Sequence, residues 1–508
     1  MRFSITTLGC KVNQYDGCAL AAALRRAGLR PAQADTPAEL LVINTCCVTS
    51  LAMRKSRQAV RRAVRSSPDA VVLVTGCYSD YDAQRIASLL AAMNVTPNKA
   101  LIAGHHSDLT ECVRQLRRAL NNVGGFGAGT SRRPTPQAGF GGNDVFMNAN
   151  RSACYDAVSP KNIKSRRAAA VKNNVAGTSG LGPIDRFDGH RRAFVKVQDG
   201  CDAFCAYCIV PYTRPRFWSR DPSEIEAECR ALVSAGHREI VLSGVCLGAF
   251  GQASANRRRR DDRNPHLPEL VRRIAEIAGL WRLRLSSLMP GDMTDELLAT
   301  CRQRPNVAPH FHLPLQSGSS NILRRMNRPY TAGQFRRTID RIREAFDRPA
   351  VTTDIIVGFP GESDADFAAT IELTRYAGFA KIHTFPFSAI EGTAAWRYRR
   401  EAPPTDVVKA RIAELAEVER ELAGNYRRQF VGEVVQALVE RADGKGNGTR
   451  EAMTDRYLRV RFGTPAKQAE QLTGSVVRLH IEQEYLDGLK GTLADTRRQR
   501  TENRKEVV

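Results

Sequence analysis

The chain has 508 residues, of which 42% are hydrophobic, and this is enough for about three domains with sizeable cores. Its 76 lysines and arginines exceed the 53 acidic residues, and the net charge of +23 favours a polyanionic partner such as nucleic acid. Arginines that merely face solvent would give the same excess. No apolar run reaches the roughly 18 residues of a membrane span, and the N-terminus has no apolar signal core. We therefore expect a cytoplasmic protein without a membrane partner, whose thiols serve metals or catalysis rather than disulfides.

Residues 2–120 alternate strand and helix patterns. Apolar strand patterns lie at 2–8, 40–44 and 70–76, and helical patterns lie at 16–27, at 53–65 and beyond residue 80. Continuous apolar strands that alternate with helices are typical of a parallel sheet covered on both faces. The pattern predicts an α/β domain over residues 1–121.

A cysteine follows each of these three strands: Cys10, Cys46 and Cys77. Parallel strands place their C-terminal ends at one edge of the sheet, where α/β proteins bind ligands. The three thiols are therefore predicted to converge as a possible three-thiolate site. Ordinary buried cysteines without a ligand role remain the alternative. Because Cys47 is adjacent to Cys46, the sequence alone leaves open which of these two thiols would belong to the site.

Residues 122–189 are rich in Gly, Pro, Ser and Asn and show no periodicity, which predicts a flexible basic linker. From residue 193 a second α/β series begins, with strand patterns at 193–198, 239–244, 282–287, 310–315, 351–359 and 381–387. About six βα units predict a partial barrel over 190–425, with its chemistry at the C-terminal strand ends. A basic insertion at 254–264 interrupts the series.

A long helical pattern at 405–430 precedes three alternating strand patterns with Gly-rich breaks. They predict a small closed β-barrel over 426–493, of a kind that often binds nucleic acid, although a purely structural cap would have the same pattern. Residues 494–508 form a polar tail.

The loop DGCDAFCAYCIVPY at 199–212 carries Cys201, Cys205 and Cys208 with no fourth cysteine nearby. Three thiolates can hold three irons of a [4Fe–4S] cluster and leave the fourth open, and an open position is typical of a reaction centre. A zinc site with a distant fourth ligand, or thiols that are close by chance, are the alternatives.

Together these motifs resemble the radical S-adenosylmethionine methylthiotransferases. The resemblance rests on the 199–212 loop and on TLGCKVNQYD at 7–16, NTC at 44–46, TGC at 75–77, LPLQSGS at 313–319, TDIIVGFPGE at 353–362 and EGT at 391–393. It covers nearly the whole chain apart from the linker, the basic insertion and the tail.

The resemblance implies an N-terminal α/β domain, a radical S-adenosylmethionine barrel and a C-terminal tRNA-gripping TRAM barrel. It implies two [4Fe–4S] clusters, an auxiliary one and the radical one, and two S-adenosylmethionine molecules per turnover, one as methyl donor and one as radical source. No side chain is a strong enough base to deprotonate the adenine C–H bond. Cofactors must therefore supply a radical that removes this hydrogen, so that a methylthio group can take its place. The implied ligands are Cys10, Cys46 and Cys77 for the auxiliary cluster and Cys201, Cys205 and Cys208 for the radical cluster. The implied S-adenosylmethionine contacts are Ser243, Gly244, Val245, Gln316, Ser317 and Asp354.

Within the family, LGCKVNQ and the 243–245 segment most resemble the branch that modifies N6-threonylcarbamoyladenosine at position 37 of tRNA. The partners implied are the tRNA anticodon loop, an electron donor and a sulfur source. The alternatives are isopentenyladenosine-37 of tRNA, an aspartate of a ribosomal protein and, from another class, a non-enzymatic metal-containing RNA-binding protein.

The chain departs from the family pattern at four positions. Pro215 replaces a usual Gly, Trp218 a usual Arg, Cys246 a usual Asn and Cys47 a usual Thr. Because proline fixes φ and lacks an amide donor, Pro215 puts the geometry of the loop after Arg214 in question.

Overall fold

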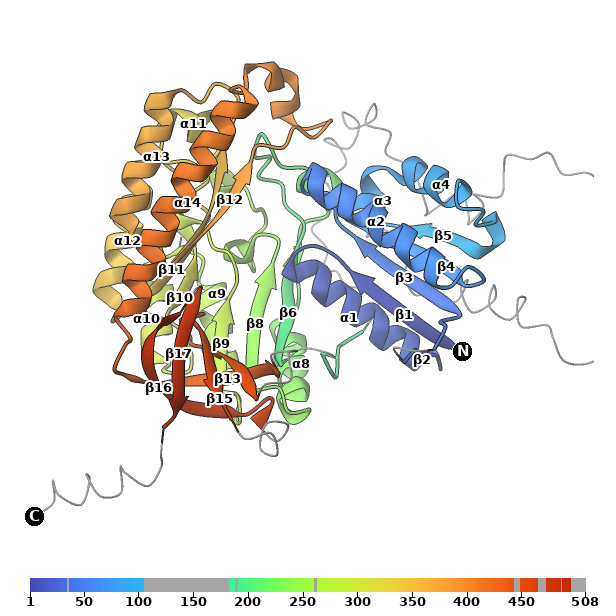
Figure 1. Cartoon of the computed structure of the whole chain (residues 1–508), viewed down its shortest axis with the longest axis horizontal. Helices are drawn as coiled ribbons and strands as arrows, with labels where there is room; N and C mark the ends of the chain where they lie inside the picture. Colours follow the sequence, from blue (N-terminus) through green and yellow to red (C-terminus); the bar gives the residue numbers. More distant parts are fainter. Residues whose placement is uncertain are drawn as a thin grey trace, which may run out of the picture.

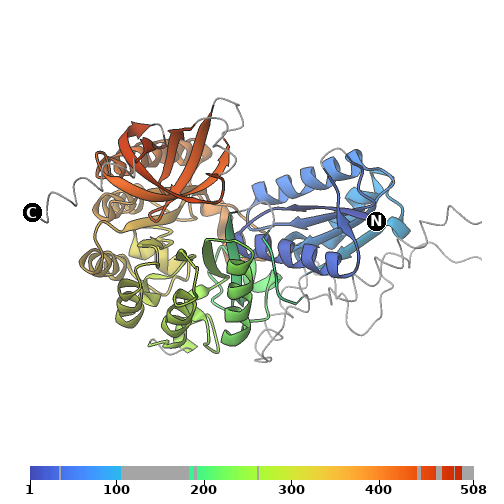
Figure 2. The same ribbon diagram turned by 90° about the horizontal axis from the view of Figure 1, so that it is seen from below.

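The computed structural model describes residues 1–33, 36–104, 182–187, 191–259, 263–442, 448–464, 472–485 and 487–494. Within these ranges the strands form three units that lie against one another (Figures 1 and 2). Most of the predicted linker, the centre of the basic insertion and the predicted tail after residue 494 lie outside the described residues. The described helices include none that is long and apolar enough to cross a membrane.

The first unit is a parallel sheet in the order β2-β1-β3-β4-β5. Its strands are β1 (Arg2–Thr7), β2 (Arg30–Pro31), β3 (Leu40–Thr45), β4 (Val71–Gly76) and β5 (Ala100–Ala103), and its helices are α1 (Lys11–Arg26), α2 (Ser50–Ser66), α3 (Cys77–Tyr81) and α4 (Ala83–Ala91). Both faces are buried: Leu40 and Val42 pack in the core that contains α1, and Leu41 and Ile43 in the core that contains α2 and α4. This two-sided burial explains the continuous apolar strands.

The second unit is a partial parallel barrel, which confirms the predicted fold class. The first part of its wall is β6 (Arg192–Asp199), β8 (Glu239–Gly244) and β9 (Arg282–Leu285), with the short antiparallel β7 (Trp218–Ser219) beside β6. The second part is β10 (His310–His312), β11 (Ala350–Val357) and β12 (Lys381–Pro386). A parallel bridge between Leu283 and Val307 joins the two parts.

Helices cover the outside of this barrel (Figure 1). They are α8 (Pro222–Ser234), α9 (His266–Ala275), α10 (Asp295–Gln303), α11 (Ser320–Arg325), α12 (Ala332–Ala345), α13 (Asp364–Ala377) and α14 (Thr405–Arg428). The short α7 (Val210–Thr213) instead packs on α3 of the first unit. On the side of the first sheet, α1 packs on β6 and β8, so that the first two units share one hydrophobic core.

The third unit is a closed five-stranded barrel, as the alternating C-terminal pattern predicts. Its strands are β13 (Val434–Ala442), β14 (Thr449–Thr454), β15 (Arg459–Gly463), β16 (Val476–Tyr485) and β17 (Gly488–Leu493), and pairing of β13 with β16 closes the ring.

The turn between β14 and β15 packs against the N-terminal end of the partial barrel. Its Tyr457 ring lies 3.9 Å from the guanidinium carbon of Arg284, 5.0 Å from that of Arg192 and 4.6 Å from the His310 ring. The fully buried Arg284 also donates to the backbone carbonyls of Thr454 and Asp455. The C-terminal barrel therefore closes the N-terminal end of the partial barrel.

Two element boundaries differ from the sequence prediction. The first helix begins at Lys11 instead of residue 16, because Cys10 is its N-cap without any side-chain cap bond and thus carries no capping signal. The strand predicted at 310–315 ends at His312, and the chain then forms only an isolated bridge from Gln316 to Ile355.

Candidate active site

The cysteines of the first unit follow three neighbouring strands. Cys10 follows β1, Cys46 directly follows β3, and Cys77 directly follows β4 as the first residue of α3. Cys46 and Cys77 are buried and Cys10 is exposed. The three thiols are close enough to influence one another electrostatically: Cys46 and Cys10 both contribute to the raised pKa of Cys77, which burial chiefly causes. The structure thus brings these three sequence-predicted residues together at one edge of the sheet.

Asn13 ties the loops that carry these thiols. Its Nδ2 donates to the backbone carbonyls of Leu8 and Thr45, each at 2.8 Å. Its Oδ1 lies 3.8 Å from the Cys77 thiol. At Gly9, φ is +100°, and an added Cβ would lie 2.9 Å from the Cβ of Cys46. The close approach of the Cys10 and Cys46 loops therefore needs glycine at this position.

Cys46 and Cys47 have different surroundings. The Cys47 thiol is packed in the apolar core under α2 and donates to the Cys77 carbonyl at 3.3 Å. The Cys46 thiol instead faces the Gly9 loop, where a built Cβ would lie 3.0 Å from its Sγ. This arrangement favours Cys46 as the third ligand of the set and assigns Cys47 a packing role.

The second cysteine set lies on the loop after β6. The loop is shaped by Gly200 at φ +78° and Phe204 at φ +49°, and a Cβ on Gly200 would overlap the Arg216 carbonyl oxygen at 1.9 Å. Asn327 donates to the Phe204 carbonyl at 2.9 Å, and Arg328 donates to the Cys205 sulfur at 3.2 Å. A metal-bound sulfur carries negative charge, which a cationic hydrogen-bond donor stabilises, so this contact suits a metal ligand.

Cys201, Cys205 and Cys208 all lie on this loop and are each partly buried. Burial, followed by the neighbouring Cys205, raises the pKa of Cys208 to about 12. Helix α7, which follows Cys208, packs on α3, which begins at Cys77. The two cysteine-bearing segments therefore meet at the boundary between the first two units.

The positions that depart from the family pattern line this region. Cys246 is buried close to Cys201, and its amide donates to Gln198 Oε1 at 2.7 Å. Trp218 packs against the ammonium of Lys196, 5.7 Å from its ring centre. Despite Pro215, the Arg214 carbonyl still accepts from the Cys201 amide at 3.3 Å. Proline at 215 is therefore compatible with the backbone contact that anchors the cysteine loop.

A buried ionic network joins the two cysteine-bearing units. Arg214 donates to both carboxylate oxygens of Asp199 at 2.8 Å, to Asp16 at 2.6 Å and to Asn13 Oδ1 at 2.9 Å. Lys196 bonds the same two aspartates at 2.6 and 2.8 Å. Because Asn13 also contacts Cys77, Arg214 is linked through one side chain to the first cysteine set. Sequence reasoning missed this network, since its members belong to separate motifs.

A polar trio lies inside the partial barrel on three adjacent strands. One ligand atom from each of His312, Asp354 and His383 lies within 4.8 Å of the others. His312 Nε2 is 3.2 Å from the Asp354 carboxylate, and its Nδ1 is 2.9 Å from the Thr352 hydroxyl. In the part of the chain that the structure describes, this is the only such compact set of three His, Cys, Asp or Glu ligands. It offers hydrogen-bonding and cation-binding groups to whatever enters the barrel.

The sequence-predicted S-adenosylmethionine contacts lie in two places. The first place is the C-terminal end of β8. Ser243 and Gly244 are the last residues of this strand, and Val245 follows it, next to Cys246. Gln316 has φ +66°, and its backbone pairs with Asp354 and Ile356. The Ser317 hydroxyl is fully buried between Thr370 Oγ1 and the Ser319 amide, so Ser317 shapes this loop.

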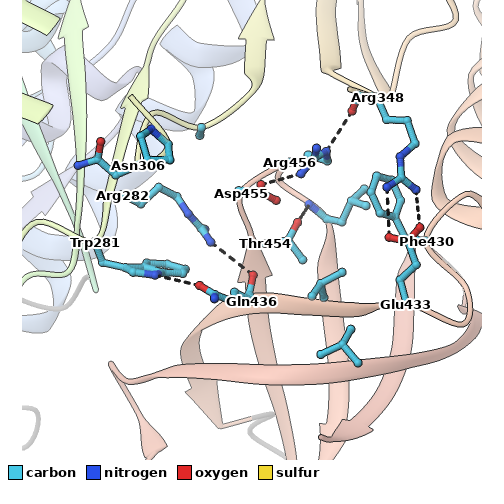
Figure 3. Close-up of a pocket in the computed structure, with 15 residues that line it drawn as sticks. Trp281, Arg282, Asn306, Arg348, Phe430, Glu433, Gln436, Thr454, Asp455 and Arg456 are labelled. Atoms are coloured by element: carbon cyan, nitrogen blue, oxygen red, sulfur yellow. Dashed lines mark hydrogen bonds and ion pairs between the residues drawn. The ribbon is translucent and has the colours of Figure 1, made fainter. Parts of the chain in front are cut away.

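A pocket of about 290 Å³ lies at the junction of the second and third units (Figure 3). Its arginines are paired, Arg348 with Glu433 at 2.7 Å and Arg456 with Asp455 at 2.6 Å, and Arg282 donates to the Gln436 carbonyl. Arg282 begins β9, at the opposite end of the strands from the cysteine loop. We interpret this pocket as part of the interface between the units and not as the catalytic chamber.

Comparison with known proteins places these features in a family. Residues 195–374 match the Radical SAM superfamily, and residues 2–96 match the Uncharacterized protein family UPF0004. The threonylcarbamoyladenosine tRNA methylthiotransferase MtaB of Chlamydia pneumoniae is 33% identical to this chain, over 87% of the chain and 88% of that protein.

The chain belongs to the radical S-adenosylmethionine methylthiotransferases. The MtaB protein of Bacillus subtilis is 30% identical over 94% of this chain and 92% of its own length. The tRNA-2-methylthio-N(6)-dimethylallyladenosine synthase of Mycobacterium ulcerans is 32% identical over 89% and 76%. This methylthiotransferase is therefore an enzyme that transfers methylthio groups, and its family implies a [4Fe–4S] cluster and S-adenosylmethionine.

The chemistry of the donor sets fits iron–sulfur clusters better than single zinc ions. A tetrahedral zinc with Zn–S bonds of about 2.3 Å needs its sulfurs within about 4 Å of one another. Among the described residues no three cysteine sulfurs are gathered within 4.8 Å. Three thiols on one loop, with a cationic Arg328 beside one sulfur, suit the negative charge of a cluster.

Replacement of Cys10 with alanine tests the two-cluster hypothesis. We expect anaerobic reconstitution to give about eight irons per wild-type chain and about four in Cys10→Ala, because each site would bind one four-iron cluster. The measurement is iron per chain together with the electron paramagnetic resonance of the reduced protein. Cys18→Ala, a change in the same helix away from the site, is the control. About four irons in both wild type and Cys10→Ala would exclude a second cluster.

Proposed function

We propose that this methylthiotransferase adds a methylthio group at C2 of N6-threonylcarbamoyladenosine at position 37 of tRNA. The observation that carries the proposal is the charged interior of the partial barrel. His312 on β10, Asp354 on β11 and His383 on β12 each place one ligand atom within 4.8 Å of the others, and His312 Nε2 lies 3.2 Å from the Asp354 carboxylate. Because the three strands are neighbours in the wall, these side chains meet inside the barrel.

A charged chamber suits one of the two tRNA substrates better. The threonylcarbamoyl group carries a carboxylate, a hydroxyl and a urea, whereas the isopentenyl group is apolar. An apolar group would displace water from His312, Asp354 and His383 and offer no hydrogen bond in return, which costs free energy. Sites built to bind polar groups discriminate strongly against analogues that lack them. The interior therefore supports the threonylcarbamoyl substrate.

The surface of α2 supports tRNA as the partner. This helix begins four residues after Cys46, has no acidic residue, and exposes five cations. They are Arg54, Lys55, Arg61, Arg62 and Arg65. Such a row binds phosphates with a salt-dependent affinity. We assign it, together with the C-terminal barrel, to the tRNA stem, so that an unstacked base of the anticodon loop can reach the barrel.

The residue roles follow the two cysteine sets. Cys201, Cys205 and Cys208 would hold a cluster with one open iron, beside Ser243, Gly244 and Val245 as contacts to S-adenosylmethionine, and Cys10, Cys46 and Cys77 would hold the auxiliary cluster. When bound, the clusters and S-adenosylmethionine supply the radical and the methylated sulfur. The chain itself aligns them with the base and excludes water, through the Arg214 network and the shared core. We assign these tasks to domains at 1–121, 190–425 and 426–493.

Nucleoside analysis tests the proposal. Deletion of the gene in its host is expected to remove 2-methylthio-N6-threonylcarbamoyladenosine from total tRNA, as measured by mass spectrometry, and the wild-type gene should restore it. The Cys205→Ala gene is the matched negative control. Loss of the methylthio isopentenyl nucleoside, or of a methylthio group on a ribosomal protein, would instead assign the enzyme to another branch.

A further inference from the structure

Three neighbouring strands bring two imidazoles and a carboxylate together inside the partial barrel. In the parallel register, His312 on β10 lies opposite Thr352 on β11, and Asp354 on β11 lies opposite His383 on β12. Thr352 and Asp354 are two residues apart on one strand and therefore point to the same face of the sheet. The side chains thus start from backbone positions that the sheet itself fixes, and not from a loop.

The distances between these side chains suit the binding of one metal ion. His312 Nε2 lies 3.2 Å from the Asp354 carboxylate. Two ligand atoms that are each about 2.1 Å from one ion, at an angle of about 90° to 110°, lie roughly 3.0 to 3.4 Å apart. The ligand atom of His383 lies within 4.8 Å of the other two, and a turn of its exposed ring would close the remaining gap.

A second contact holds His312 in the orientation of a metal ligand. Its Nδ1 lies 2.9 Å from the Thr352 hydroxyl, and this hydroxyl lies 3.3 Å from Nε2 of the buried His310. Metal-bound histidines generally use their second ring nitrogen for such a hydrogen bond, which fixes the ring and leaves the first nitrogen for the metal. A simple ion pair between His312 and Asp354 would need neither this support nor a second imidazole on the next strand.

We propose that His312, Asp354 and His383 bind a divalent first-row metal ion, and that its open positions receive the carboxylate and the hydroxyl of the substrate's threonylcarbamoyl group. Two imidazoles and one carboxylate leave coordination positions free for oxygen ligands. The carboxylate and the hydroxyl of a threonyl group can close one chelate ring around such an ion. The choice of this ligand rests on the proposed function, whereas the metal site itself does not.

The metal site is separate from both cysteine sets. Its nitrogen and oxygen ligands suit a single ion, whereas thiolates select iron–sulfur clusters and softer metals. Ile356, two residues beyond Asp354 on β11, belongs to the same apolar cluster as Tyr207 of the cysteine loop. The site therefore lies close to that loop, one step deeper along β11. The carboxylate of S-adenosylmethionine is thus the other possible source of the same ligand chemistry.

Binding of Mn²⁺ to the reconstituted full-length enzyme tests the metal site without any RNA. Mn²⁺ favours oxygen ligands over thiolates, and electron paramagnetic resonance measures the unbound ion. We expect wild type to bind one Mn²⁺ per chain that His383→Gln binds about 100-fold more weakly. Thr352→Val should weaken binding about tenfold, because it removes only the hydroxyl that orients His312. His266→Gln removes an exposed histidine of α9 and is the matched control, which should bind as wild type does.

Anticodon stem-loops test which group the ion receives. The stem-loop with N6-threonylcarbamoyladenosine is expected to bind wild type roughly tenfold more tightly in Mn²⁺ than in an equal concentration of Mg²⁺, which keeps its own waters and leaves the phosphate screening unchanged. A stem-loop with unmodified adenosine should show no such gain, and the gain should disappear in His383→Gln. Equilibrium dialysis of S-adenosylmethionine separates the two carboxylate sources, because its affinity should be the same in either ion.

The possible failures are distinct. Equal Mn²⁺ binding by wild type and His383→Gln would overturn the metal site, whatever the tRNA substrate is. A tenfold gain in S-adenosylmethionine affinity with Mn²⁺, or no gain for the threonylcarbamoyl stem-loop, would overturn the assignment of the open positions to the substrate. If cells make the methylthio threonylcarbamoyl nucleoside and one of these results is found, this inference fails and the proposed function stands.

Discussion

Replacement of Cys205 with alanine is expected to abolish reductive cleavage of S-adenosylmethionine and to leave tRNA binding nearly intact. Cys205 is the central thiol of the 201–208 loop, and its sulfur accepts a hydrogen bond from Arg328 at 3.2 Å. Two remaining thiols cannot hold a cluster whose fourth iron must stay open for S-adenosylmethionine. The exposed cations of α2 are untouched by the change, and they carry most of the expected phosphate affinity.

The measurement is the yield of 5′-deoxyadenosine from the anaerobically reconstituted variant with dithionite, next to tRNA binding by filter retention. Cys301→Ala is the matched control, since Cys301 is a buried cysteine of α10 outside both cysteine sets. That variant should lose some stability from its small cavity and keep its cleavage rate. Cleavage that continues in Cys205→Ala would show that the radical cluster has other ligands.

Replacement of Arg214 with methionine is expected to produce the largest loss of stability of any single change discussed. The Arg214 side chain is only 4% exposed and is the shared partner of Asp16 and Asp199. Without it, Lys196 alone would face two buried carboxylates, and Asn13 Oδ1 would lose its charged donor. Removal of one partner from a buried ionic network typically costs about 3–5 kcal/mol.

The predicted functional consequence is loss of alignment between the two cysteine-bearing units. We expect Arg214→Met to lose methylthio transfer to tRNA far more than cleavage of S-adenosylmethionine, because all six cysteines remain. Thermal unfolding and the ratio of methylthio product to 5′-deoxyadenosine measure the two effects. Arg230→Met, which removes an exposed arginine of α8 paired with Glu226, should change neither by much. An unchanged product ratio in Arg214→Met would assign the network to stability alone.

Convergence of Cys10, Cys46 and Cys77 could be predicted from the sequence because parallel strands end at a common edge. The structure brings these thiols together there, and their role as cluster ligands stays a prediction. The Arg214 network could not be predicted, since its geometry depends on how two sheets from distant parts of the chain pack together.

The same physical limit explains the other differences. Cys10 caps a helix without a capping side chain, so the start of α1 has no local signal. The proximity of His312, Asp354 and His383 depends on the register between β10, β11 and β12, which a sequence does not reveal. Tyr457 reaches Arg284 from a different unit altogether.

The hydrogen bonds from Arg284 to the carbonyls of Thr454 and Asp455 limit where the chain can be truncated between its domains. A truncated chain that ends before β13 would keep all six cysteines, yet Arg284 in its partial barrel would lose two of its three hydrogen-bond acceptors and keep only Glu239. In such a fragment the N-terminal end of the partial barrel would be exposed to solvent. A chimera with a foreign C-terminal barrel would have the same exposed end, unless the foreign turn between β14 and β15 supplied both carbonyls and the aromatic ring. The C-terminal barrel is thus a structural part of the catalytic domain and not an exchangeable module.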